Sequence, residues 1–319
     1  MNRMELMSVK SDIQPIVLVC AADNNYAMPL AVTVSSAVAN VKNNRKIALF
    51  VLDGGISEFN KRKITKSLNP AQISVSWVKP DNALFENLVL TRHLTPTCYY
   101  RLLITEFLPK EFDKAIYLDT DMVVTGDLAE LWDIDIEENY VLAVQDDVEL
   151  NIGMSEGLRN YKEIGISPDE KYFNSGLLVI NMKKWRDENI GKKVIEYVKQ
   201  NREYVRNDQD GLNAVLAGKW GELHPKWNIM PKIYDYQSSQ DSPLAPEVYN
   251  ELLENPCIIH YTNSPKPWYA GLKEECKHPK KHLFFEYLDI TAWSGWRDTY
   301  WRRLWRKFMK ITSLTTAKL

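Results

Sequence analysis

Apolar runs and amphipathic stretches alternate along the first half of the chain. Continuous apolar runs typical of buried strands cover 16–20, 47–52, 73–78 and the residues leading to 118. The stretches between them predict helices over 28–41, from a cap at Ser57 to 68, and over 97–108. Strands that alternate with helices in this way predict an α/β fold with a largely parallel sheet.

The second half places polar residues at the ends of its apolar runs. A strand over 140–144 leads to Asp146, and the segment Phe173-Asn174-Ser175-Gly176 precedes an apolar run over 177–180. A long helix is predicted to open at Met182, another to begin at Asp208, and a late strand to cover 256–260. Near residue 292 the composition shifts to tryptophan and arginine, which marks a distinct C-terminal segment.

Composition narrows the class of protein. A chain of 319 residues with 45% hydrophobic content can form one large domain with an appendage. A formal net charge of -2 argues against a nucleic-acid-binding protein. The four cysteines are widely spaced, and Cys20 and Cys257 in apolar runs indicate core thiols of a reducing compartment. Residues 1–12 lack an apolar signal core, so we expect a soluble, cytoplasmic protein.

The strongest chemical signal is Asp119-Thr120-Asp121, at the end of an apolar run. Side chains two apart on an extended chain point the same way. Two carboxylates in that arrangement suit a magnesium- or manganese-type cation, which in turn holds a diphosphate. The alternative is a solvated pair of aspartates in a turn. It explains poorly why the pair sits among apolar residues, since buried carboxylates need a compensating charge.

Polar residues follow several of the expected strands. They are Asp23, Asn25, Asp119, Asp121, Asp146 and His260. In an open α/β sheet, ligands bind at the carboxyl ends of the strands, so these groups are expected to converge on one crevice. The chain has neither a dinucleotide-binding Gly-x-Gly-x-x-Gly nor a P-loop. A phosphate site here must therefore use a metal and basic side chains.

Several short motifs occur together, in one order, over 16–268. They are Ala21-Ala22-Asp23-x-Asn25-Tyr26-Ala27, Val51-Leu52-Asp53-x-Gly55-Ile56-Ser57, Tyr117-Leu118-Asp119-x-Asp121, Phe173-Asn174-x-Gly176, Asp208-Gln209-Asp210 and His260-Tyr261-x5-Pro267-Trp268. On these motifs the chain resembles the retaining glycosyltransferases of family 8. It is most similar to the bacterial lipopolysaccharide galactosyl- and glucosyltransferases.

The resemblance implies a GT-A type fold, with a Rossmann-like, mixed but mainly parallel sheet flanked by helices. It places a catalytic domain over 1–271 and a C-terminal helical region over 272–319. It also implies a UDP-hexose donor and a bound manganese, with magnesium as the alternative cation. Asp119, Asp121 and His260 correspond to the metal ligands, and two carboxylates with an imidazole suit manganese. For His260 the alternative is a half-buried histidine at a strand end.

Residues at the nucleotide end are likewise assigned from the resemblance. They are Ala21, Asp23, Asn25, Tyr26, Thr120, Asn263 and Lys266. A carboxylate can accept from the base NH, an aromatic ring can stack on the base, and a lysine acts on the diphosphate as a point charge. The family usually has a glycine where this chain has Asn263, so the backbone there is expected to approach the phosphate less closely.

The same resemblance assigns five residues to positions around the transferred sugar. They are Arg101, Asp146, Asn174, Asp208 and Gln209. The alternatives are a surface role for Arg101, helix capping for Asp208 and Gln209, and a turn role for Asn174. Retention of configuration is implied by the family. Either Asp208 or Gln209 acts as a transient nucleophile, or the acceptor attacks from the leaving-group face. We favour same-face attack, because an amide oxygen is a poor nucleophile.

Other classes of protein share parts of this pattern. A metal-dependent phosphohydrolase could use the Asp119 and Asp121 pair, but it would need further carboxylates or a nucleophile. A silent nucleotide-sugar-binding module would lack the sugar-site residues. A glycogenin-like self-glycosylating initiator needs an acceptor tyrosine, and with 16 tyrosines in the chain this is the main alternative function.

The C-terminal stretch over 293–314 is amphipathic when plotted as a helix. One side carries Trp293, Trp296, Tyr300, Trp301, Leu304, Trp305 and Phe308, whereas Arg302, Arg303, Arg306 and Lys310 lie on the other. Aromatic residues opposite cations are typical of helices at anionic membrane surfaces, although a terminal helix packed on the domain would show the same pattern. We therefore expect peripheral attachment to the inner face of the cytoplasmic membrane, and a saccharide or glycolipid acceptor, as in the relatives.

Overall fold

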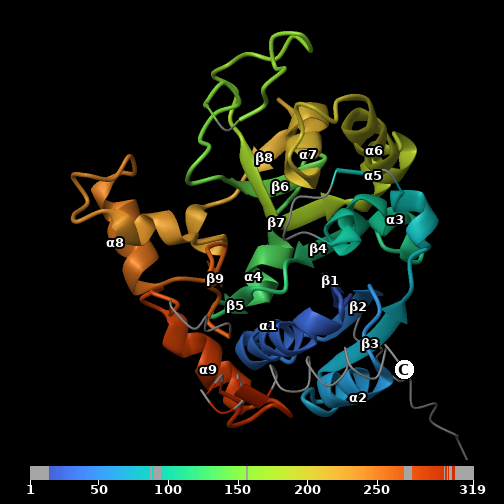
Figure 1. Ribbon diagram of the computed structural model, residues 1–319, viewed down its shortest axis with the longest axis vertical. Helices are drawn as coiled ribbons and strands as arrows, with labels where there is room; N and C mark the ends of the chain where they lie inside the picture. The colour runs from blue at the N-terminus through green and yellow to red at the C-terminus, as the bar shows by residue number, and fades with distance from the viewer. Residues whose placement is uncertain are drawn as a thin grey trace, which may run out of the picture.

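A seven-stranded sheet forms the centre of the protein (Figure 1). The computed structural model describes residues 14–305, apart from 87, 90–94, 156, 269–274, 298, 300, 302 and 303. The strands follow the order β3-β2-β1-β4-β7-β6-β8. Their bounds are β1 Ile16–Ala22, β2 Ile47–Asp53, β3 Ile73–Val78, β4 Lys114–Leu118, β6 Val141–Gln145, β7 Phe173–Asn181 and β8 Trp220–Glu222.

The sheet is mixed but mainly parallel, as the sequence predicted. Strands β1 to β4 run parallel, as do β6 and β8, whereas β7 is antiparallel to both of its neighbours. Because β7 is reversed, its first residues lie beside the last residues of β6, with Val144 opposite Asn174. The start of β7 and the ends of β4 and β6 therefore meet at one edge of the sheet.

Helices flank the sheet on both sides (Figure 1), with α1 and α2 on one side and α5 and α6 on the other. The helices are α1 Ala27–Asn40, α2 Glu58–Lys66, α3 Ile104–Phe107, α4 Leu128–Asp133, α5 Met182–Asp187, α6 Ile190–Gln200, α7 Asp208–Leu216, α8 Pro246–Glu254 and α9 Lys281–Asp289. Strand β1 pairs on both edges and is buried along its whole length, which explains its continuous apolar run. Ser57 caps α2 as expected, because its Oγ accepts from the Asn60 backbone NH at 3.3 Å.

Two of the expected helices differ from the structure. The segment predicted as a helix over 97–108 is mostly a 3₁₀ helix, Pro96–Leu103, with one α-helical turn after it. The long helix predicted from Met182 is two helices, because Asn189 between α5 and α6 has a left-handed backbone with φ 53°. That conformation does not continue a right-handed helix.

A small sheet brings the end of the chain onto this core. Strands β5 Met122–Val124 and β9 Ile258–His260 pair antiparallel, with Met122 opposite His260. One apolar cluster joins α1, β5, β9 and α9 through Val32, Val123, Ile259, Phe284 and Leu288. Helix α9 therefore packs on α1, β5 and β9, and the boundary at 271 remains a prediction.

The predicted C-terminal helix is wrong at its beginning. Trp293 lies in a turn after α9 rather than in a helix. Gly295, with φ 71°, donates to Asp289 Oδ1 at 3.0 Å, and Arg297 pairs with the same carboxylate at 2.8 Å. Trp301, Leu304 and Trp305 are helical, while 306–314 lie outside the described residues. Among the helices that are described, none combines the length and the apolar composition needed to cross a membrane.

Candidate active site

A cleft of about 840 Å³ opens at the edge of the sheet where β4 ends and β7 begins. It brings together side chains from widely separated parts of the chain. Among those that line it are Asn25, Tyr26, Arg101, Asp119, Asp121, Asp208, Gln209, His260 and Lys266. The convergence predicted from the strand ends is confirmed for Asn25, Asp119, Asp121 and His260, whereas Asp23 and Asp146 line other cavities.

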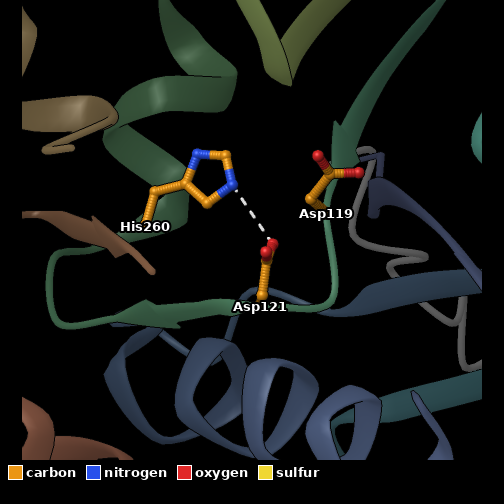
Figure 2. Close-up of side chains that lie close together, drawn as sticks. All are labelled: Asp119, Asp121 and His260. Carbon is orange, nitrogen blue, oxygen red and sulfur yellow. Dashed lines mark ion pairs between the residues drawn. The ribbon is translucent and has the colours of Figure 1, made fainter. Parts of the chain in front are cut away.

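Three side chains in the cleft form a candidate metal centre (Figure 2). Asp119 follows β4, Asp121 precedes β5, and His260 ends β9, which pairs with β5. One ligand atom of each residue lies within 4.8 Å of the others, and Nε2 of His260 is 3.1 Å from Asp121 Oδ1. Two carboxylates and an imidazole that face a common point match the set of ligand atoms that a manganese-type cation binds.

Lys266 provides positive charge at this centre. Its ammonium lies 2.8 Å from Asp121 Oδ2 and donates to the Thr262 carbonyl at 2.9 Å. Burial acts to raise the pKa of Asp121, but Lys266 and His260 outweigh it and hold that pKa well below its usual range. Asp121 is therefore ionised, as a metal ligand must be.

Arg101 links the metal centre to helix α7. Its guanidinium donates to Asp119 Oδ1 at 2.8 Å and to the Ser175 carbonyl at 2.6 Å, and its Nε lies 3.0 Å from Asp208 Oδ2. Only 5% of Arg101 is exposed, so the surface alternative is wrong. A buried cation between two carboxylates compensates both charges.

Asp208 is a buried carboxylate paired with Arg101. Its Oδ2 lies 3.0 Å from Nε of Arg101, which also donates to the Cys98 carbonyl at 3.0 Å. Burial raises the pKa of Asp208 to about 6, against the lowering effect of Arg101. The capping alternative is wrong, because Asn207 caps α7 by accepting from the backbone NH of Gln209 at 3.0 Å.

The other expected sugar-end residues are hydrogen-bonded to one another, with Gln209 lining the cleft and Asp146 and Asn174 buried. Asp146 Oδ2 accepts from Asn174 Nδ2 at 3.1 Å and from Gln209 Nε2 at 3.3 Å. Gln209 Oε1 in turn accepts from the Ser175 backbone NH at 2.9 Å. Asn174 lies within β7, so its role as a turn residue before the strand is excluded.

The residues assigned to the nucleotide surround an adjoining cavity. Ala21, Asp23, Tyr26 and Thr120 line a space of about 140 Å³, which shares Tyr26 and Asp119 with the large cleft. Asp23 Oδ1 accepts from the backbone NH groups of Asn25 at 2.9 Å and Tyr26 at 3.2 Å, and so shapes this loop. Asn263 instead lines a neighbouring cavity of about 420 Å³.

Several residues at the site were not identified from the sequence. Asn228 Oδ1 lies 3.0 Å from Nδ1 of His260, and no motif marks Asn228 because it sits in an irregular segment. Trp293 and Trp296 line the large cleft, although the sequence assigned them to a membrane-binding helix. Trp293 is held there by Lys63, whose Nζ lies 4.1 Å from the centre of its ring.

Comparison with known proteins gives consistent matches. The family model for glycosyl transferase family 8 matches residues 17–271. General stress protein A of Bacillus subtilis is 34% identical over 281 residues, covering 87% of this chain and 94% of that protein. Lipopolysaccharide 1,2-glucosyltransferase of Escherichia coli is 26% identical over 250 residues, covering 77% of this chain and 71% of the enzyme. The structure of the galactosyltransferase LgtC with donor and acceptor sugar analogues is 30% identical, with a TM-score of 0.74, covering 90% and 99%.

Proposed function

The chain belongs to glycosyl transferase family 8, and on this premise we propose that it is a metal-dependent, retaining hexosyltransferase. It would move galactose or glucose from a UDP-sugar to a saccharide or glycolipid acceptor of the lipopolysaccharide type. The observation that carries the proposal is the grouping of Asp119, Asp121 and His260 beside Lys266 in one large cleft.

Manganese is the proposed cation, with magnesium as the alternative. When bound by the two carboxylates and the imidazole, the cation would neutralise the diphosphate of the donor. The Lys266 ammonium lies beside Asp121 and can stabilise the negative charge that develops on the diphosphate as the leaving group departs. Asp23, Asn25 and Tyr26 would hold the uridine at the adjoining cavity.

The sugar would lie between this centre and the start of α7. Asp208 lines the cleft, and its carboxylate can accept from a sugar hydroxyl while Arg101 keeps it in place. Gln209 Oε1 already accepts from the Ser175 NH, which reduces its electron density and its nucleophilicity. This supports attack by the acceptor from the leaving-group face over a glycosylated Gln209.

A membrane-bound acceptor is also part of the proposal. Trp301 and Trp305 are 76% and 64% exposed and, with Leu304, are spaced to share one helical face. Large exposed apolar side chains next to basic residues suit the interface of an anionic membrane. The chain would thus act at the inner face of the cytoplasmic membrane, where a glycolipid acceptor is within reach.

The test is a panel of nucleotide sugars, with UDP-glucose, UDP-galactose, ADP-glucose and GDP-mannose offered with and without manganese. We expect donor turnover with one or both UDP-hexoses, dependent on the metal and increased by an oligosaccharide acceptor. Preference for ADP or GDP donors, or equal rates after chelation, would contradict the proposal. Mass spectra of the protein after turnover separate the alternative, because a self-glycosylating initiator would carry hexose adducts itself.

A further inference from the structure

Four buried side chains form an unbroken hydrogen-bonded series from the sugar end of the site to the metal centre. Asp146, Asn174, Asn228 and His260 are exposed by 7%, 7%, 1% and 4%. We propose that Asn228, through this series, is a positioning residue that presents Nε2 of His260 as the metal-binding nitrogen. The importance of that nitrogen for a metal rests on the proposed function.

The direction of each hydrogen bond follows from the chemistry of the series. A backbone NH only donates, so the Gly176 NH, at 3.0 Å, assigns the amide oxygen of Asn174. The amide nitrogen of Asn174 then faces Asp146 and donates to its Oδ2 at 3.1 Å. The orientation of the Asn174 amide is therefore set by a backbone group that cannot change role.

The orientation of the Asn228 amide follows from that of Asn174. Because Asn174 presents its oxygen, Asn228 must donate with Nδ2, and the two atoms are 2.9 Å apart. Asn228 then presents Oδ1 to Nδ1 of His260 at 3.0 Å. Since a carbonyl oxygen only accepts, Nδ1 must carry a proton.

A neutral imidazole has one N–H and one lone pair. Because Nδ1–H is held by Asn228, Nε2 is the nitrogen that points at Asp121 in Figure 2, and its lone pair is the one available to a cation that displaces this contact. A histidine that binds a metal commonly donates its other ring NH to such a partner, and loss of that partner typically lowers metal affinity about 10–100-fold. Asn228 fits this role, although it touches neither carboxylate of the triad in the described structure.

The series also joins the two ends of the site. Gln209 Nε2 donates to the same Asp146 oxygen, so the sugar-end amide and the metal-binding imidazole are oriented by one carboxylate. The role of Asp146 is then to orient both groups from behind the cleft, rather than to contact the metal.

The test reads the proton on Nδ1 directly, by ¹⁵N NMR of histidine-labelled, metal-free protein. With five histidines in the chain, a His260→Gln spectrum identifies the signal. We expect a proton on Nδ1 in the native chain and in Asn228→Asp, which retains an acceptor. Asn228→Ala should reduce the protonation of Nδ1, because Asp121 then accepts from Nε2 with no acceptor left at Nδ1. The matched control is Asn160→Ala, because Asn160 is an equally buried amide that bonds to Tyr197 and Asn201, away from the site.

Manganese binding, measured by EPR of the free ion, supplies the second readout. Asn228→Ala should bind about 10–100-fold more weakly than the native chain, and Asn160→Ala equally well. A native ring without a proton on Nδ1, or an unchanged ring and affinity in Asn228→Ala, overturns the inference. If the ring responds as expected but the native chain binds no manganese, the positioning role stands and the proposed metal dependence fails.

Discussion

A Cβ atom at Gly176 would lie 2.4 Å from Cε1 of His260, so the glycine leaves the space that the imidazole fills. The Gly176→Ala variant is expected to push the ring out of the triad. Manganese affinity should fall about tenfold or more, as when a group that orients a ligand is lost. EPR titration measures this, and thermal unfolding checks that the fold persists. Native affinity in the variant would show that the ring can shift without cost.

Removal of Asp121 should abolish transfer and leave the fold intact. Asp121→Ala deletes a carboxylate at a strand end, where, in the part of the chain that the structure describes, Lys266 and His260 are its ion-pair partners. Calorimetric titration of UDP should show manganese-enhanced binding in the native chain and none in the variant. Asp133→Ala, a change of the same kind at a carboxylate that is 60% exposed, is the control. Equal UDP affinity with and without manganese in the native chain would reject the metal assignment.

Arg101 is expected to be the charge whose loss destabilises the site most. Arg101→Leu leaves Asp119 and Asp208 uncompensated, and breaking a buried ion pair typically costs about 3–5 kcal/mol. Urea unfolding should report a loss of this size, whereas Arg45→Leu, which breaks an exposed pair with Asp133, should cost about 1 kcal/mol or less. A similar loss in both variants would mean that Arg101 is not special to the buried cluster.

Asp147 should make stability depend on pH. Burial, with repulsion from Asp146, raises its pKa to about 7, above the value of about 3.9 in the unfolded chain. The folded state therefore holds the proton of Asp147 more tightly than the unfolded chain does. The stabilisation of the folded state by this proton is complete below pH 4 and is lost as the pH rises through about 7. Asp147→Asn should unfold at a higher temperature than the native chain at pH 8, with a smaller difference at pH 5. A constant difference between the two pH values would contradict the shift.

The exposed aromatic residues should govern membrane attachment. The double change Trp301→Ala and Trp305→Ala removes two large exposed side chains and should release the protein from anionic liposomes in sedimentation at low salt. Phe59→Ala, at a residue that is 64% exposed on α2, is the control for lost apolar surface. If native and doubly substituted chains remain equally in the supernatant, a soluble saccharide becomes the better acceptor.

Much of the sheet was predictable because buried strands show as continuous apolar runs. The polar residues after β1 and β4 were predictable as a site, since the carboxyl ends of parallel strands in one sheet share an edge. His260 ends β9 in the second, two-stranded sheet and reaches the site because β9 pairs with β5. Asn174 entered only through the family resemblance, because nothing local indicates that β7 runs in the opposite direction. That reversal alone brings Asn174 beside Val144 and into contact with Asp146.

Other features depend on contacts between distant residues and leave no local pattern. Asn228 is one asparagine in an irregular segment, and its importance appears only when β9 brings His260 against it. The break at Asn189 was missed because asparagine is compatible with a helix as well as with a left-handed backbone. The turn at Gly295 was missed because helical periodicity in the tryptophans outweighed a single glycine.

That turn also determines how the end of the chain could be exchanged. Trp293 and Trp296 belong to the wall of the cleft, whereas Trp301 and Trp305 are exposed beyond it. A chimera in which the residues after Arg297 come from another protein would have a new surface-binding segment and would keep the cleft of this chain. A chain cut at 291 would lose part of that wall as well, and its failure to bind membranes or to transfer sugar could then not be assigned to one cause.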